Sequence, residues 1–151
     1  MFNANTDEVI YLSRSDTDNP LASYALNAFE LDGEHWPSAE HYYQGSKFED
    51  KTLRDQIINA DTAHLAYKIA RKNSQYARQD WKKIRKLIMT RGLYIMFKTH
   101  PPAADKLLST RDIKLIENSQ YDYYWGCGRD LRGDNTYGHV LMGIRSKLRE
   151  Q

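Results

Sequence analysis

An acid and an amine lie seven residues apart in a short aromatic stretch: Glu40 and Lys47, between Trp36 and Phe48. Residues three, four and seven apart share one helix face, so Glu40, Tyr43 and Lys47 are expected to point the same way. Burial raises the pKa of a carboxyl group and lowers that of a lysine, which suits acid–base or Schiff-base chemistry. The stripe therefore predicts a lined pocket, with Glu40 and Lys47 catalytic and Tyr43 in contact with substrate. A solvated helix face is the alternative.

A glycine-bearing loop, residues 125–135, runs into a helix start at Thr136. Glycines let backbone N–H groups approach a ligand, and a helix N-terminus favours anionic oxygens. The spacing matches neither a P-loop nor a dinucleotide fingerprint, and a tight surface turn with a cap is the alternative. The substrate contacts expected from this loop are Trp125, Gly126, Asp130, Asp134 and Asn135.

Two further residues, Trp81 and Cys127, are of types that can take part in chemistry. Trp81 opens a long helical segment and is an expected stacking contact, with core packing as the alternative. Cys127 lies between two glycines and is expected to be exposed but incidental, because no histidine nearby in the sequence could activate it. A single cysteine excludes an internal disulfide, and Cys and His are too sparse for a structural zinc site. No metal or cofactor is predicted.

The totals favour one compact domain. A chain of 151 residues with 40% apolar residues is expected to form one domain, residues 1–151. Its net charge of only +2 does not indicate a broad nucleic-acid surface, although basic residues between 71 and 86 leave DNA as a possible, less favoured partner. Residues 1–7 lack a signal-peptide pattern and no window approaches the ~20 apolar residues of a membrane span, so a cytoplasmic protein is expected.

The local patterns predict a mainly helical α+β fold with a small antiparallel sheet. Strands are expected at Val9–Leu12 and at 113–117, and a hairpin at Phe29–Trp36 around Asp32-Gly33. The expected helices follow their capping residues. The first is expected to begin after Ser38, and the next two to span residues 53–60, after Thr52, and 62–71, after Asp61. Two more are expected at residues 80–99 and 101–108, and Asn135 is expected to cap the last one.

Together these residues resemble the YbiA-like, or NADAR, family. The resemblance covers about Val9 to Leu148. It rests on Leu31-Asp32-Gly33, Trp36-Pro37-Ser38-x-Glu40-His41-Tyr42-Tyr43-Gln44-x-x-Lys47-Phe48, Asp80-Trp81, Leu107-Leu108-x-Thr110, Trp125-Gly126-x-Gly128, Gly133-x-Asn135-x-x-Gly138 and Leu141-Met142-x-x-Arg145.

The resemblance implies an N-glycosidase that cleaves the bond between ribose and a base-like ring. Its implied substrates are phosphorylated early riboflavin intermediates, with release of ribose 5-phosphate. Removal of ADP-ribose from guanine in DNA and non-catalytic binding of ADP-ribose are the alternatives. The family pattern places the essential carboxylate on Glu40 and the pocket lysine on Lys47. Binding groups fall on Trp81, Trp125, Asp130 and Asn135, and Arg71 is expected to hold ribose hydroxyls or phosphate.

The chain departs from the family pattern at three places. Ala22-Ser23-Tyr24 stands where the family often has Ser-Asn-Phe, Ala70 where a glycine is common, and Leu131 where a glycine is frequent. These departures leave the reaction class in place and leave the substrate open.

Overall fold

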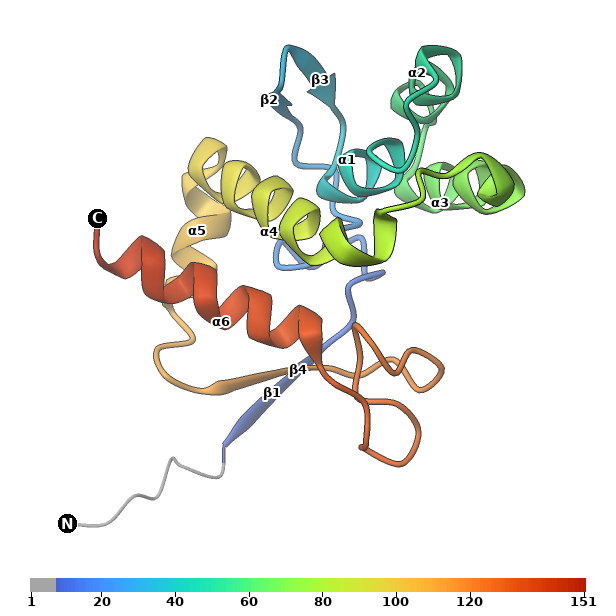
Figure 1. Cartoon of the computed structure of the whole chain (residues 1–151). Helices are drawn as coiled ribbons and strands as arrows, with labels where there is room; N and C mark the ends of the chain where they lie inside the picture. The colour runs from blue at the N-terminus through green and yellow to red at the C-terminus, as the bar shows by residue number, and fades with distance from the viewer. Residues whose placement is uncertain (1–7) are drawn as a thin grey trace, which may run out of the picture.

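The computed structural model describes residues 8–151 and shows a mainly helical α+β fold, as expected (Figure 1). Residues 1–7, which lack a signal-peptide pattern, lie outside the described part. The helices are α1 (Ala39–Gly45), α2 (Lys51–Ile58), α3 (Ala63–Lys72), the 3-10 turn η1 (Ser74–Tyr76), α4 (Trp81–Thr99), α5 (Pro101–Leu108) and α6 (Thr136–Arg149). The strands are β1 (Val9–Leu12), β2 (Phe29–Leu31), β3 (Glu34–Trp36) and β4 (Lys114–Glu117). Within residues 8–151, no helix combines the length and apolarity needed to cross a membrane.

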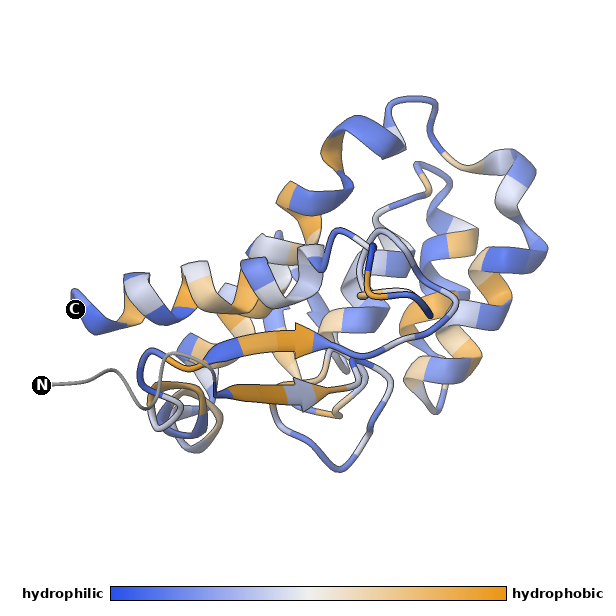
Figure 2. Cartoon of the chain, turned by 90° about the horizontal axis from the view of Figure 1, so that it is seen from below, coloured by the Kyte–Doolittle hydropathy of each residue, from blue (hydrophilic) through white to orange (hydrophobic). Residues whose placement is uncertain are grey.

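The strands form two small sheets, of which the sequence predicted one. Strands β2 and β3 make the expected antiparallel hairpin, with Phe29 opposite Trp36. Asp32 and Gly33 both adopt positive φ, as a type I′ turn requires. The second sheet pairs β1 with β4 in parallel, with Leu12 opposite Glu117. Figure 2 shows these two largely apolar strands side by side.

Several helix ends differ from the expected ones. Helix α1 stops at Gly45, so Lys47 lies in the turn that follows and not on the helix. The Asp50 carboxylate caps α2 by accepting from the N–H groups of Thr52 and Leu53, which displaces Thr52 as the predicted cap. Thr62 caps α3, in place of Asp61. At both caps, a neighbouring side chain accepts from the free N–H groups of the first turn in place of the predicted one: Asp50, two residues before Thr52, and Thr62, one residue after Asp61.

Helix α1 is buried along its whole length, and α2, α3 and α4 pack around it. Its predicted cap is present, since the Ser38 hydroxyl accepts from the N–H of His41. The polar side chains of a buried helix must find partners inside the protein. The His41 ring does so by bonding to Ser38 and to the carbonyl of Ala60, and burial lowers the pKa of this ring.

Helix α6 packs directly on β4, at the other side of the core. Gly138 makes this possible, because a Cβ there would lie 2.2 Å from the carbonyl oxygen of Leu115. Asn135 precedes the helix but does not cap it with its side chain, contrary to the prediction. Its amide bonds instead to β4, donating to the carbonyl of Leu115 and accepting from the N–H of Glu117.

Gly138→Ala is expected to lower the free energy of unfolding by about 1–3 kcal/mol, since the rigid backbone of β4 cannot move away from the added methyl. Gly143→Ala in the same helix is the matched control, because a Cβ there meets nothing within 4 Å. The control is expected to gain about 0.5–1 kcal/mol from the better helix propensity of alanine. Urea unfolding measures both, and equal effects would contradict the close contact between α6 and β4.

Candidate active site

The carboxylate of Glu40 is fully buried, with 0% of its surface exposed. Three side chains donate to it. Its Oε1 accepts from Arg14 Nη1 at 2.5 Å and from the Ser23 hydroxyl at 2.7 Å, and its Oε2 accepts from Gln44 Nε2 at 2.6 Å. A carboxylate that accepts from a guanidinium and two neutral donors is held as an anion in one orientation. The structure thus builds a fixed negative charge at this point of the core.

Arg14 is the residue of this cluster that the sequence did not reveal. It lies just after β1, in a turn-rich segment that carries no helical or strand pattern. Its guanidinium contacts the faces of Tyr43 and Trp125 at 5.8 and 5.7 Å from the ring centroids, and its backbone N–H donates to Glu117. Burial lowers the pKa of the Arg14 guanidinium, but Glu40 raises it, with help from nearby tyrosines, so its net pKa is above the ordinary arginine value.

Lys47 faces the same aromatic cluster from the other side. Its Nζ lies 5.4 Å from the centroid of Tyr43 and 5.7 Å from that of Trp81. No carboxylate of residues 8–151 pairs with it at ion-pair distance. Burial lowers the pKa of Lys47, and the charge of Glu40 offsets only part of this effect. Glu40, Tyr43 and Lys47 therefore share one site although Lys47 lies beyond the end of α1.

The aromatic residues hold the two charged groups in place. Tyr43 is buried between Trp81 and Trp125, with ring centroids 5.0 and 5.5 Å away. The indole N–H of Trp125 donates to the Tyr43 hydroxyl, and burial raises the pKa of Tyr43 to about 12. Of the predicted substrate contacts, Tyr43, Trp81 and Trp125 thus lie beside the catalytic candidates.

Most backbone N–H groups of the glycine loop are already bonded within the protein, so the loop offers an anion few of the donors that the sequence suggested. Apart from those of Gly126, Arg129 and Asp130, they donate to protein carbonyls or side chains. The donors to carbonyls are Cys127, Gly128, Leu131, Gly133, Asp134 and Asn135, followed by Thr136 and Tyr137 at the start of α6. The glycines serve close packing instead, since a Cβ at Gly126 would lie 2.6 Å from Glu117 Oε1 and one at Gly133 would lie 2.4 Å from the carbonyl oxygen of Gly126.

The remaining loop residues lie outside the aromatic cluster. Asp130 is exposed and accepts from the N–H of Arg132, and Asp134 is exposed as well. The Asn135 side chain is committed to β4. Cys127 is buried, contrary to the expectation that it is exposed, because the loop folds back over it. Within residues 8–151 no three His, Cys, Asp or Glu side chains gather as a metal site would need.

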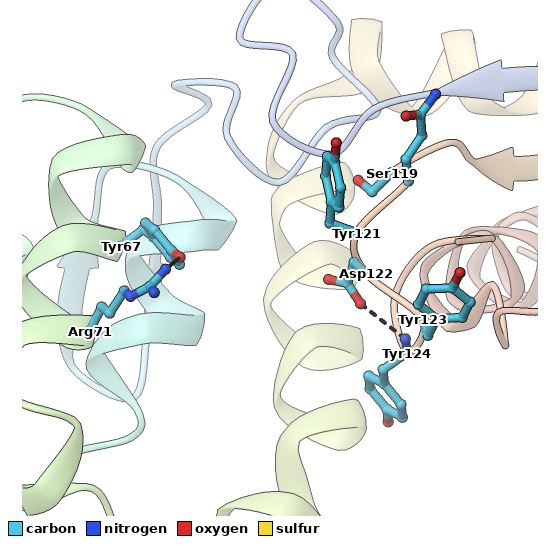
Figure 3. A pocket seen from close by; sticks show the side chains of 8 residues that line it. Tyr67, Arg71, Ser119, Tyr121, Asp122, Tyr123 and Tyr124 are labelled. Carbon is cyan, nitrogen blue, oxygen red and sulfur yellow. Dashed lines mark hydrogen bonds between the residues drawn. The ribbon is translucent and has the colours of Figure 1, made fainter. Parts of the chain in front are cut away.

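An open cleft of about 660 Å³ lies between α3 and the segment 119–124. Figure 3 shows Tyr67 and Arg71 on the α3 side, facing the segment that carries Asp122 and three tyrosines. The exposed Arg71 guanidinium donates to the Tyr67 hydroxyl at 2.8 Å. Asp122 holds the opposite wall by accepting from the N–H groups of Tyr124 and Trp125. The ring of Trp125 lies between this wall and the buried cluster, 4.8 Å from the ring of Tyr124 and 5.5 Å from that of Tyr43.

A family model described as the NADAR domain matches residues 1–149 of the chain. The chain belongs to the NADAR family of YbiA-like N-glycosidases. It is 32% identical over 138 residues to the Escherichia coli (strain K12) protein named N-glycosidase YbiA, which covers 91% of this chain and 86% of that protein. The NMR structure of E. coli YbiA matches with a TM-score of 0.84, over 95% of this chain and 86% of the other.

A longer relative carries the name of a pathway. The chain is 36% identical over 145 residues to riboflavin biosynthesis protein VVA0006 of Vibrio vulnificus. The match takes in 95% of this chain but spans only 40% of the length of that relative. The family and the fold expected from the sequence are thus confirmed.

Arg14→Met is expected to lower the free energy of unfolding by about 3–5 kcal/mol, because it leaves the Glu40 charge buried without its cation. Arg132→Met is the control, since its pair with Asp130 is exposed and such pairs contribute about 0–1 kcal/mol. The double variant Arg14→Met/Glu40→Gln removes the unpaired charge and is expected to recover most of the loss. Denaturant unfolding of the natural chain, Arg14→Met, Glu40→Gln and the double variant measures this coupling, and additive effects would show that Arg14 and Glu40 act independently.

Proposed function

We propose that this chain hydrolyses the C–N bond between ribose and a base-like ring, and that its substrates are the phosphorylated early intermediates of riboflavin synthesis, the 5-amino-6-ribosylamino-pyrimidine 5′-phosphates. The products are ribose 5-phosphate and the free aminopyrimidine. The observation that carries the proposal is the buried Glu40 carboxylate, held by three donors, in one aromatic cluster with a lysine of lowered pKa. The pathway named for the Vibrio vulnificus relative supports the choice of substrate.

Lys47 is proposed as the nucleophile. A ribosylamine opens when its ring C–O bond breaks, which leaves C1 doubly bonded to the amine nitrogen. The uncharged Lys47 amine adds to C1, and the aminopyrimidine leaves with the electron pair of its C–N bond and a proton. Water then adds to the resulting Schiff base and releases ribose 5-phosphate, which restores the lysine. Over one turnover, one water is consumed and one C–N bond is replaced by a C–O bond.

Glu40 is proposed to stabilise the positive charge that develops at C1 and on the iminium nitrogen. A fixed anion in a site closed to water stabilises such charge strongly, because no solvent has to reorganise during the reaction. Arg14, Ser23 and Gln44 keep the carboxylate from turning away. Trp81 and Trp125 flank the reacting sugar and the departing ring, and Arg71 lies across the cleft from the tyrosines.

Glu40→Gln and Lys47→Ala are each expected to lower kcat for release of ribose 5-phosphate by about 10²–10⁴-fold, the range for loss of a group that acts on the reacting centre. Lys51→Ala is the control, because Lys51 is exposed and pairs with Asp55 on the surface. The assay uses both riboflavin precursors and guanine-ADP-ribosylated DNA, so that it also compares the substrates. Full activity in both site variants, or precursors left intact by the natural chain, would refute the proposal.

Borohydride is expected to trap a ribose 5-phosphate adduct on Lys47, and mass spectrometry of the digested protein locates it. Trapping needs the uncharged amine. Because burial lowers the pKa of Lys47 below the ordinary lysine value near 10.5, half-maximal trapping is expected at a lower pH than for a free lysine. Lys47→Arg gives the background. If Lys47→Arg still forms as much trapped adduct as the natural chain, at another residue, Lys47 is not the nucleophile.

A further inference from the structure

The phosphate of the proposed substrate needs a cation or donor that the protein does not already use. Most N–H groups of the glycine loop, and those of Thr136 and Tyr137 at the start of α6, are committed to protein carbonyls. Arg14 is paired with Glu40, and the Lys47 amine is required uncharged for the chemistry. Arg71 is bonded to Tyr67 on the outer wall of the cleft. Of the groups that the sequence suggested for the phosphate, the loop N–H groups are thus largely occupied, and Arg71 is exposed and bonded to Tyr67.

Arg85 is a cation at this site that has no protein partner. It lies on α4, four residues after Trp81. Its side chain takes part in no hydrogen bond or ion pair within residues 8–151, and its Nε is buried without a partner. Other arginines of the described chain are paired, for example Arg78 with Asp80 and Arg91 with Asp32. Leaving a buried guanidinium N–H unpaired costs free energy unless a ligand supplies the acceptor.

The Arg85 guanidinium is also held in a fixed position. Its Cζ lies 3.4 Å from the ring centroid of Tyr124, which is stacking distance. Tyr124 belongs to the wall of the cleft in Figure 3. A guanidinium that lies flat on a ring keeps its edge free, and this edge presents parallel N–H donors that match two oxygens of a phosphate.

Arg85 lies beside the aromatic cluster, because the Tyr124 ring on which it stacks has its centroid 4.8 Å from that of Trp125. Its positive charge contributes to the lowered pKa of Lys47, after burial as the larger cause. The charge of Arg85 also lowers the pKa of the Tyr43 hydroxyl, whereas burial, the larger effect, raises it. Because Arg14 already neutralises Glu40, the positive charge of Arg85 is left without a counter-charge among residues 8–151, and such a charge favours an anionic ligand.

We propose that Arg85, stacked on Tyr124, binds the phosphate of the substrate and makes the site selective for phosphorylated ribosides over unphosphorylated ones. This proposal rests on the proposed N-glycosidase function and adds to it the residue that recognises the anionic end of the sugar. The same donor fork fits a phosphate monoester, as in ribose 5-phosphate, and the diphosphate of ADP-ribose. The ligands compared in the experiment separate these two sources.

Calorimetry with ribose 5-phosphate, ADP-ribose and ribose tests the proposal on the natural chain and on Arg85→Gln, Arg85→Lys and Lys83→Gln. The natural chain is expected to bind ribose 5-phosphate more tightly than ribose. Arg85→Gln is expected to weaken binding of the phosphorylated ligand by about 10–100-fold, the effect of losing charge-assisted hydrogen bonds. Arg85→Lys keeps the charge without the fork, so a partial loss is expected. Lys83→Gln, on an exposed position of α4, is the control and should bind as the natural chain does.

The ligand affected identifies the source of the phosphate. A loss confined to ribose 5-phosphate assigns Arg85 to the monoester, and a loss confined to ADP-ribose assigns it to the diphosphate. If Arg85→Gln binds both phosphorylated ligands as the natural chain does, or if binding of ribose falls by the same factor, Arg85 has a structural role only and the proposal is overturned. Equal affinity of the natural chain for ribose and ribose 5-phosphate would overturn it as well.

Turnover measurements keep this proposal distinct from the proposed function. With active enzyme, Arg85→Gln is expected to raise KM for the phosphorylated riboside and leave KM for its dephosphorylated form unchanged. A chain that binds ribose 5-phosphate through Arg85 but releases none from either riboflavin precursor would retain the phosphate site and lose the proposed reaction. A chain that cleaves phosphorylated and dephosphorylated ribosides equally well would retain the reaction and lose the phosphate site.

Discussion

The carboxylate of Glu40 carries its charge with no surface in contact with solvent, and this constraint determines much of the architecture around it. A buried anion requires a cation and further donors within the fold. Arg14 supplies the cation, and it is placed by the parallel pair β1–β4, which ends at Leu12 and Glu117 just before it. Glu117 then accepts from the Arg14 backbone N–H. The small second sheet therefore has a clear role, since it brings Arg14 to the first turn of α1, where Glu40 lies.

The same electrostatic balance explains the state of Lys47. A lysine that contacts Tyr43 and Trp81 loses hydration, and Arg14 and Arg85 oppose a third positive charge nearby. Glu40 favours the charged amine, but its anion is already neutralised by Arg14. The protein thus lowers the pKa of the lysine without removing the carboxylate that the proposed reaction needs. The proposed nucleophile and the proposed anionic stabiliser can share one cluster because Arg14 already pairs with the carboxylate.

The parts of the site that the sequence predicted are those that follow from local spacing. Glu40, Tyr43 and Lys47 lie within two helical turns, and the Asp32-Gly33 hairpin is set by its turn residues. Arg14 could not be found in this way, because only the pairing of strands distant in the sequence brings it to Glu40. The glycine loop was misinterpreted for another reason. Glycine permits a ligand to approach the backbone, but at Gly126 and Gly133 it permits the approach of other protein atoms.

Glu40 is buried and the tyrosine-lined cleft is open, and this difference affects which part of a substrate the protein recognises most strictly. Glu40 is fully buried among its three donors, whereas the tyrosine-lined cleft is open and holds about 660 Å³. In the proposed reaction, C1 of the ribose must reach the closed end, because Glu40 and Lys47 act there. The departing ring lies toward the open end, where stacking on flat side chains tolerates different rings. Under the proposed reaction, selectivity for the sugar and its phosphate is therefore stricter than selectivity for the ring. Ser23 stands where the family often has asparagine, and it donates to Glu40. This departure from the family pattern thus changes the surroundings of Glu40 and not the tyrosine-lined cleft.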